Sequence, residues 1–268
     1  MEKVQSITIC GGRDKNGRPE DCRLHLVPGD IAAVVGPTGS GKSRLLADIE
    51  YLAQGDTPSG RRILLNGQPP DPAERFGIGT KLIAQLSQNM NFVLDATVGE
   101  FIAMHAACLE REEVGAAEDS SPSLSSGMSL AEQVLEQANR LAGEAFTLDT
   151  PLTALSGGQS RALMIADTAI LSDSPIVLID EIENAGIDKR LALEVLVDRQ
   201  KIVIMATHDP ILALSGHYRL VLGNGALKSV LKTEAGELSL LEELRAADVR
   251  LAAIRQALRT GERLHSGM

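Results

Sequence analysis

The chain has 268 residues, enough for a sizeable core in one large or two small domains, and it carries a formal charge of −10 with only 2% aromatic residues. This acidic balance argues against nucleic acid as a main partner, because such binding depends on clusters of Lys and Arg. Three cysteines without a Cys-x-x-Cys pair, no apolar run long enough to cross a bilayer and no signal-peptide pattern lead us to expect a cytoplasmic protein.

The sequence of the first part of the chain predicts short strands and one helix. The first two strands show partial alternation of apolar and polar residues, and the third is a continuous apolar run, typical of a strand buried on both faces. A glycine-rich loop separates that strand from the helix. The predicted elements, in chain order, are strands at 4–9, 22–27 and 30–35, a helix at 43–53, and strands at 61–67 and 81–89.

From about Thr97 the pattern becomes helical. Residues 96–110 place Val98, Phe101, Ile102 and His105 near one face of a helix. The stretch 115–129 is rich in Ser, Gly and acidic residues, which indicates a flexible loop or insertion. Two more helices are predicted, at 130–143 and after the glycine turn at 156–158.

Alternation of strands and helices resumes near the end of the chain. A strand at 175–180, a helix at 189–200, a strand at 201–209 and a hairpin about Asn224-Gly225 are expected. The tail at 238–264 is amphipathic, with an apolar stripe. We interpret it as a helix packed on its own domain, with a partner-binding helix as the alternative. The stripe comprises Leu241, Leu244, Leu251, Ile254 and Leu258.

The sequence GPTGSGKS at 36–43 matches the phosphate-loop pattern G-x-x-x-x-G-K-[ST] in full. It lies between a predicted apolar strand and a helix, where backbone N–H groups and the helix N-terminus can converge on phosphate oxygens. Lys42 can reach the β- and γ-phosphates, and the Ser43 hydroxyl can hold Mg²⁺. The candidate phosphate-binding residues are Gly36, Pro37, Thr38, Gly39, Ser40, Gly41, Lys42 and Ser43.

Two carboxylates end the apolar strand at 175–180. Asp180 can reach Mg²⁺, directly or through water, and Glu181 can orient or deprotonate an attacking water. Without other motifs, we would interpret such a pair as a solvated loop edge. The phosphate loop favours the metal-binding interpretation instead, because a Mg-nucleotide site needs an acidic residue at the end of a second strand in addition to the phosphate loop.

A third motif, LSGGQ at 155–159, opens a helix with two adjacent glycines. Such glycines weaken helix initiation, so another requirement must favour residues without side chains at these two positions. The phosphate loop, Gln88, this LSGGQ turn, the acidic strand end and His208 occur in that order. Together they resemble the nucleotide-binding domain of the ABC (ATP-binding cassette) ATPases, over about residues 4–232.

The resemblance implies an α/β fold: a P-loop NTPase of ABC type, with a mixed sheet core, an antiparallel β edge and an inserted α-helical subdomain. The ATPase core would comprise 1–95 and 150–232. The helical subdomain would comprise 96–150, including the Ser-rich loop at 115–129. The remaining 233–268 would form a C-terminal helical tail.

The resemblance also implies a head-to-tail pair of such domains, a second copy or a homologue. Each ATP would lie between one subunit's phosphate loop and the LSGGQ turn of the other. In that turn Ser156, Gly157, Gly158 and Gln159 would close over the γ-phosphate. Glycine is expected there because a side chain would hold the opposing phosphate away.

Two further residues take their roles from the resemblance alone. Gln88 matches the glutamine that senses Mg²⁺ and the γ-phosphate, with Gln85 as a nearby competitor. His208 matches the switch histidine, which would contact the γ-phosphate and hold Glu181 and the water in line. The implied catalytic residues are thus Glu181, His208 and Gln88, and the implied Mg²⁺ ligands are Ser43, Gln88 and Asp180.

The sequence departs from the family pattern in two places. The family usually has an aromatic residue before the phosphate loop on which adenine stacks, but residues 1–50 contain none. Arg13 could stack on the base, or Ile9 could pack against it, and ATP over GTP is inferred from the family. The segment IENAGID at 182–188 is also unusual, although Asp188 matches the aspartate that contacts the other subunit.

Two functions remain open at this point. The main hypothesis is the ATP-binding subunit of a membrane transporter, held at the inner face of the membrane by a separate membrane-spanning partner. The alternative is a soluble ABC ATPase that remodels or activates a protein or metallocofactor complex. Both hypotheses require ATP and Mg²⁺, and Glu181 and His208 favour hydrolysis over a passive scaffold.

Overall fold

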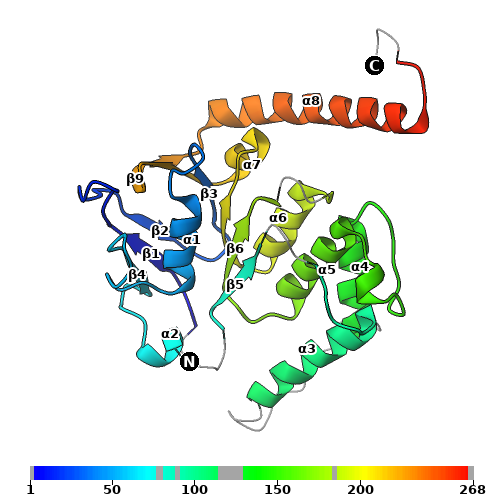
Figure 1. Cartoon of the computed structure of the whole chain (residues 1–268), viewed down its shortest axis with the longest axis horizontal. Helices are drawn as coiled ribbons and strands as arrows, with labels where there is room; N and C mark the ends of the chain where they lie inside the picture. The colour runs from blue at the N-terminus through cyan, green and yellow to red at the C-terminus, as the bar shows by residue number, and fades with distance from the viewer. Residues whose placement is uncertain (1–2, 77–80, 88–90, 114–128, 183–185, 265–268) are drawn as a thin grey trace.

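The computed structural model describes residues 3–76, 81–87, 91–113, 129–182 and 186–264. Gln88 and residues 115–128 of the expected Ser-rich loop lie outside this part of the chain. Figure 1 shows two sheets beside a group of helices, with one long helix lying across the top. Among the described residues, no helix combines the length and apolar character needed to span a bilayer.

The larger sheet has six strands, of which the first five in space are parallel. Its edge strand β9 runs antiparallel to β8 and joins it through the expected hairpin. The order in space is β5 (Ile83–Leu86), β6 (Ile176–Asp180), β7 (Ile202–Ala206), β3 (Ile31–Val35), β8 (Tyr218–Gly223) and β9 (Ala226–Lys232). This arrangement confirms the predicted mixed sheet with an antiparallel edge.

The smaller sheet is antiparallel and packs over one face of the larger one. It contains β2 (Leu24–Leu26), β1 (Ile7–Cys10) and β4 (Arg62–Leu65), in that order. Between the sheets lies helix α1 (Lys42–Glu50), whose Leu45, Leu46 and Ile49 are buried. Ile9 belongs to this core and is 2% exposed, so the expectation that it could pack against a nucleotide base is wrong.

Three helices cover the opposite face of the six-stranded sheet. They are α5 (Gly157–Ile170), α6 (Lys189–Asp198) and α7 (Pro210–Ser215). Successive side chains of a strand point to opposite faces, so Ile204 enters the core with α1 while Val203 and Met205 enter the core with α6. Burial on both faces explains why these strands are continuous apolar runs rather than alternating ones.

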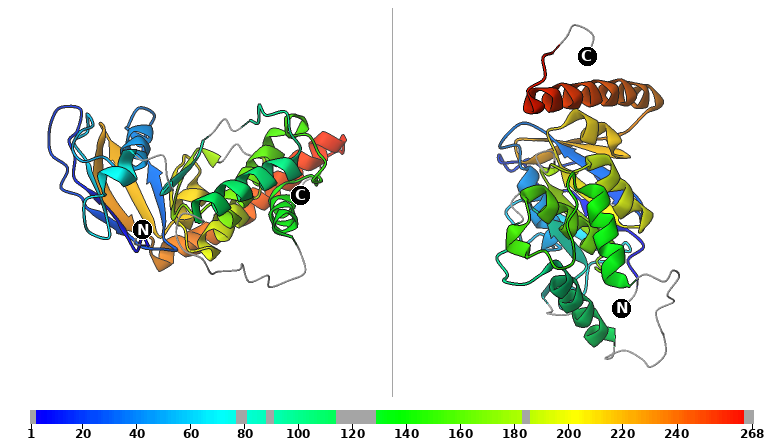
Figure 2. Two further views of the ribbon diagram at one scale, coloured as in Figure 1. Left: turned by 90° about the horizontal axis from the view of Figure 1, so that it is seen from below. Right: turned by 90° about the vertical axis from the view of Figure 1, so that its right-hand side faces the viewer.

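A separate helical core lies beside the sheets. Helices α3 (Val98–Glu113), α4 (Leu130–Leu141) and the middle and end of α5 share it, together with the 3₁₀ turn Leu152–Ala154. Val98 and Ile102 of the predicted apolar face are buried there. Figure 2 shows these helices grouped at one side of the molecule, away from the three-stranded sheet. The helical interruption of the strand–helix alternation is therefore confirmed.

The C-terminal tail forms one long helix, α8 (Ala235–Thr260), which packs against α7 (Figure 1). Leu241 is buried at that contact, but Leu251 and Leu258 are half exposed or more. Only part of the predicted stripe therefore serves packing on the chain's own domain. The short helices α2 (Pro72–Phe76) and α7 were not predicted, because each has too few residues to show a helical period.

Candidate functional site

The loop at 36–41 turns the chain from β3 into α1 and requires glycine at both ends. A Cβ on Gly36 would lie 2.5 Å from the Leu222 carbonyl oxygen, and a Cβ on Gly41 would lie 3.0 Å from Cα of Gly225. Gly41 also has φ 107°, a value in the left-handed region that favours glycine. The loop is therefore pressed against the β8–β9 turn, and any larger residue at these two positions would displace it.

The basic side chains at this loop donate to its own carbonyl groups. Lys42 Nζ lies 2.9 Å from the Gly36 oxygen, and Lys15 Nζ lies 2.9 Å from the Gly39 oxygen. Both amino groups thus lie where the loop's N–H groups and the N-terminus of α1 already favour negative charge. An incoming phosphate would find two ammonium groups within reach of the same loop.

The phosphate loop opens into a pocket of about 300 Å³, here called the phosphate-loop pocket. It brings together residues from the loop, from the end of β6, from the end of β7 and from the 13–19 turn. Its lining residues are Lys15, Thr38, Gly39, Gly41, Lys42, Ser43, Arg44, Asp180, Glu181 and His208. The sequence predicted all of these residues except Lys15 and Arg44.

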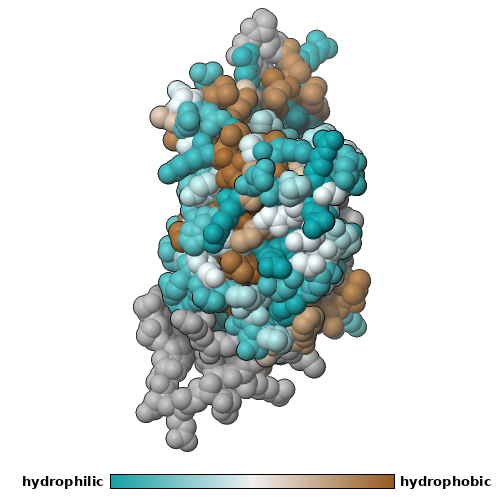
Figure 3. Space-filling view, turned by 90° about the vertical axis from the view of Figure 1, so that its left-hand side faces the viewer, coloured by the Kyte–Doolittle hydropathy of each residue, from teal (hydrophilic) through white to brown (hydrophobic). Residues whose placement is uncertain are grey.

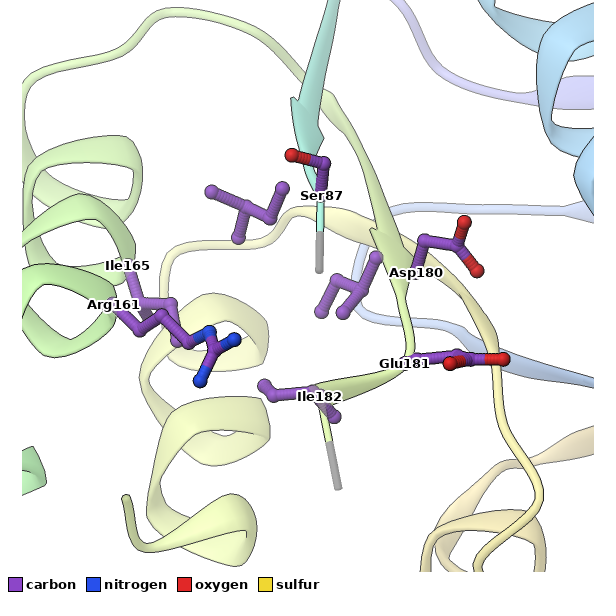
Figure 4. Close-up of a pocket in the computed structure, with 8 residues that line it drawn as sticks. Ser87, Arg161, Ile165, Asp180, Glu181 and Ile182 are labelled. Carbon is purple, nitrogen blue, oxygen red and sulfur yellow. The ribbon is translucent and has the colours of Figure 1, made fainter. Parts of the chain in front are cut away.

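Asp180 is the last residue of β6, and the backbone turns sharply at Glu181. Glu181 has φ 50°, an unusual conformation for a residue with a side chain, and its N–H donates to the Ala206 oxygen at 3.1 Å. The turn places the Glu181 carboxylate 3.9 Å from Nε2 of His208. Figure 4 shows the Asp180 and Glu181 carboxylates pointing away from Arg161, which extends from α5 on the other side of β6.

A small cavity behind these carboxylates joins three parts of the site. It is lined by the end of β5 with Ser87, by β6 and by Arg161 and Ile165 of α5 (Figure 4). The helix that begins at the LSGGQ turn therefore packs beside β6 of its own chain through its second and third turns, where Ile165 and Ile179 share one core.

His208 is followed by a residue that fixes the start of α7. Asp209 accepts hydrogen bonds from the N–H groups of Ile211 and Leu212 and from Nζ of Lys189, the last at 2.6 Å. Burial alone would raise the pKa of Asp209, but these hydrogen bonds and the Lys189 charge outweigh it and hold the pKa below its usual value. The ionised Asp209 thus anchors the segment that carries His208.

The LSGGQ turn caps α5 and remains on the surface. The Ser156 hydroxyl accepts from the Gln159 N–H at 3.3 Å, and the Gln159 side chain accepts in return from the Ser156 N–H at 2.9 Å. A Cβ on Gly157 would meet nothing within 4 Å. The chain's own fold therefore does not require glycine at 157.

Several sequence-predicted residues fall elsewhere. Gln88 lies outside the described residues. The amide of its competitor Gln85 lies 3.0 Å from the Glu50 carboxylate, oriented so that its nitrogen donates, and does not line the phosphate-loop pocket. Asp188 caps α6 by accepting from the Leu191 N–H at 3.0 Å. The described residues that line the pocket include Lys15 rather than Arg13.

A buried ionic network that the sequence did not predict connects the segments that form the pocket. Arg61 is fully buried and makes ion pairs with Glu20 and with Asp48 of α1, the latter at 2.8 Å. Its Nη2 also donates to the Gly225 oxygen at 2.8 Å, and Gly225 N–H donates to the Ser40 oxygen. One arginine thereby connects α1, the β8–β9 turn and the segment that follows the Lys15 turn.

Comparison with known proteins identifies the family. The family model for ABC transporters matches residues 19–184. An uncharacterized ABC transporter ATP-binding protein of Methanocaldococcus jannaschii, MJ0121, is 50% identical over 265 residues, which cover 98% of this chain and 95% of that protein. A lipoprotein-releasing system ATP-binding protein LolD 1 of Rhodopirellula baltica is 28% identical and covers 76% of this chain and 85% of its own length.

A solved structure shows the same fold. The cbiO1 protein from Clostridium perfringens, described as part of the ABC transporter complex cbiONQ, superposes with a TM-score of 0.59 at 21% identity. The match covers 96% of this chain and all of that one. With its phosphate loop, acidic strand end and LSGGQ turn in these places, the chain belongs to the ABC transporter family of ATP-binding proteins, and it is an ATP hydrolase.

Proposed function

We propose that this chain is the ATP-binding subunit of a membrane transporter, which hydrolyses Mg-ATP in a head-to-tail pair and drives a conformational change in membrane-spanning partner subunits. The relative with 50% identity along nearly the whole chain is named an ABC transporter ATP-binding protein, which supports the transporter assignment over the soluble remodelling ATPase. On this proposal the protein lies at the inner face of the membrane, held there by its partner.

The phosphate-loop pocket would hold the triphosphate of ATP. The N–H groups at 36–43 and the N-terminus of α1 would bind the phosphate oxygens. On binding, Lys42 would exchange its hydrogen bond to the Gly36 carbonyl for a charge-assisted one to phosphate. Lys15 would approach from the opposite rim, where its amino group already contacts the Gly39 carbonyl.

The donor set of the pocket fits Mg²⁺. The Ser43 hydroxyl and the Asp180 carboxylate both line it, and oxygen ligands are those that Mg²⁺ prefers. In the described part of the chain, no group of three His, Cys, Asp or Glu side chains could hold a metal by itself. Phosphate oxygens would complete the ligand set, together with Gln88, which follows β5 in the sequence. When bound, the ion would neutralise charge on the phosphates.

Two side chains of the pocket would act on the water. Glu181 would orient the water and accept its proton, and His208 would hold the γ-phosphate and the carboxylate in line. Their separation of 3.9 Å leaves both groups facing the same space without a short mutual hydrogen bond. Asp209 and Lys189 would keep the His208 segment in place.

The observation that carries the head-to-tail arrangement is the open space at Gly157. A glycine that its own chain does not need, exposed at the N-terminus of a 14-residue helix, supports an approach by a phosphate from outside. The LSGGQ turn does not line the chain's own phosphate-loop pocket. A second protomer would supply the phosphate, and Ser156, Gly157, Gly158 and Gln159 would cover it.

One substitution tests this arrangement. In a Glu181→Gln background, Gly157→Leu leaves the fold intact because nothing surrounds that Cβ, but it should abolish the increase in dimer that ATP causes in sedimentation, measured at a protein concentration low enough for the chain to be a monomer without nucleotide. Gly236→Leu in the first turn of α8, where the Cβ is also unobstructed, is the matched control and should dimerise normally. An equal ATP-dependent increase in dimer for both variants would contradict the shared site.

The transporter assignment has its own test. Purification of the chain with its native partners should recover a protein with several membrane spans. Recovery of only soluble proteins or a metallocofactor complex would instead favour the remodelling ATPase.

A further inference from the structure

The outward face of α8 carries an unbroken apolar stripe. Its members follow one another at intervals of 4, 3, 4, 3 and 4 residues, the heptad spacing with which one helix packs along another. Leu240, Leu251 and Leu258 of the stripe are 48%, 50% and 59% exposed. The complete outward stripe is Leu240, Leu244, Ala247, Leu251, Ile254 and Leu258, of which Leu244 and Ile254 are half-buried and the other four exposed.

This stripe is not the face that packs on the body of the protein. Leu241 is the buried residue of α8 at α7, and Leu238 and Arg245 line the cavity between α7 and α8. At 100° per residue, Leu251 and Leu258 lie about 80–100° around the helix from Leu241 and about 120–160° from Leu238 and Arg245, so the stripe is turned away from the face that packs on the body. In the space-filling view of Figure 3, brown apolar atoms lie among teal ones at the top of the molecule, at the level of α8.

The spacing of the stripe is the same when it is read in either direction. A second α8 turned end for end about residue 249 would place its Leu258 level with Leu240, its Ile254 with Leu244 and its Leu251 with Ala247. Each layer would then be apolar, and a small alanine would face a leucine near the centre. An interface between identical chains with a two-fold axis requires a self-complementary patch of this kind.

The charges along α8 favour the same antiparallel orientation. Residues 234–243 contain four glutamates and no basic residue, whereas residues 250–260 contain three arginines and no acidic residue. An antiparallel pair brings the acidic end of one helix level with the basic end of the other. A parallel pair would set like charges beside each other, at an energetic cost that depends on salt concentration.

We propose that α8 pairs antiparallel with α8 of a second copy of this chain through the outward stripe, and that this contact does not require nucleotide. No α8 residue lines the phosphate-loop pocket among the described residues. The contact would therefore persist after ATP hydrolysis, when the nucleotide-mediated contact opens. Two protomers tethered in this way would re-form their ATP-dependent contact as an intramolecular event, at a high effective concentration.

The oligomeric state of the full chain without nucleotide tests the contact. In EDTA, wild type should sediment as a dimer at about 50 µM, the range expected for a short helix pair with micromolar affinity. Leu251→Glu should be largely monomeric at the same concentration, which corresponds to an affinity weakened at least about 1,000-fold, because the carboxylates of both chains would enter the apolar seam. Val249→Glu is the matched control, since Val249 is 70% exposed on the other side of the helix; it should remain dimeric.

A monomeric wild type, or a dimer that Leu251→Glu leaves intact, would overturn the proposal. Both variants should bind ATP as wild type does, because neither residue belongs to the pocket. If wild type itself does not bind ATP, the nucleotide site is wrong while the α8 contact is judged separately by sedimentation.

Cysteine cross-linking tests the orientation. With the native Cys10, Cys22 and Cys108 replaced by Ser, Leu240→Cys and Leu258→Cys are prepared as separate proteins. Under mild oxidation a disulfide dimer should form when the two proteins are mixed and not in either alone. Cross-linking of Leu240→Cys with itself would indicate a parallel pair and contradict the proposal.

Discussion

Oε1 of Glu181 lies 3.9 Å from Nε2 of His208, and the two residues reach this position from the ends of adjacent strands β6 and β7. The sheet alone does not produce the arrangement. Glu181 adopts φ 50° directly after Asp180, and its N–H is held by the Ala206 carbonyl of β7. The backbone turn therefore directs two successive carboxylates into one pocket instead of to opposite faces of a strand.

Glu181→Gln should bind ATP and dimerise but hydrolyse it at least about 100-fold more slowly, because an amide cannot accept the proton of the attacking water. Single-turnover release of phosphate measures the chemical step, and sedimentation with ATP measures the dimer. Wild-type turnover by this variant would exclude Glu181 as the group that activates water.

Glu181→Gly should be more stable than Glu181→Ala, although neither variant should hydrolyse ATP. A residue with a side chain at positive φ is strained by about 1 kcal/mol, and glycine removes that strain. The free energy of unfolding in urea should therefore rise by about 0.5–1 kcal/mol relative to Glu181→Ala, which keeps the strain but lacks the carboxylate. Equal stability of the two variants would mean that the φ value costs nothing.

Lys15→Ala should weaken ATP binding by about fivefold, the effect of one partly exposed charge contact worth about 1 kcal/mol. The loss should be smaller for AMP than for ATP and should shrink at high salt, because Lys15 lies at the rim beside the Gly39 carbonyl. Fluorescence or calorimetric titration measures the affinity for each nucleotide. Arg13→Ala, two residues away but not lining the pocket, is the control; an equal loss there would assign the effect to the turn as a whole.

The fold and most of the pocket could be predicted from the sequence because the relevant signals are local. The phosphate loop, the Asp180–Glu181 strand end and His208 each lie where an apolar strand stops, and parallel strands bring their carboxyl ends to one edge of the sheet. Local patterns also predicted the hairpin at Asn224-Gly225 and the helical core.

What the sequence did not predict depends on contacts between distant segments. Lys15 reaches the pocket because its N–H bonds to the Asn224 carbonyl and its side chain packs on Gly225. Arg61 follows a turn and would be expected on the surface, yet it is fully buried between Glu20 and Asp48. No local pattern distinguishes these two cations from the exposed ones.

Arg61→Met should be strongly destabilising, because it leaves two carboxylates buried without their partner. Glu20 and Asp48 have side chains only 1% exposed, and removal of one member of a buried ion pair costs about 3–5 kcal/mol. Urea unfolding measures the loss. The triple variant Arg61→Met, Glu20→Gln, Asp48→Asn should recover part of it, since no buried charge remains; a triple variant as unstable as the single one would show that lost packing dominates.

The stability of the helical core should depend on pH through His105. Nδ1 of His105 on α3 lies 2.9 Å from the Asp167 carboxylate of α5. This hydrogen bond, with the negative charges of Asp167 and Asp173, outweighs partial burial and raises the pKa of His105 above its usual value. The folded state therefore binds the proton more tightly than the unfolded state does.

Because the pKa is raised on folding, the contribution of His105 to the free energy of unfolding is fully present below the unfolded value of about 6.5 and is lost as pH rises through the folded value. Wild type should therefore lose stability relative to His105→Gln as the pH rises above about 6.5, whereas the difference should be constant well below that value. Urea unfolding of both proteins across this range measures it. A wild-type stability that rises over this interval, relative to His105→Gln, would mean that folding favours the neutral imidazole, and the ion pair between α3 and α5 would then be wrong.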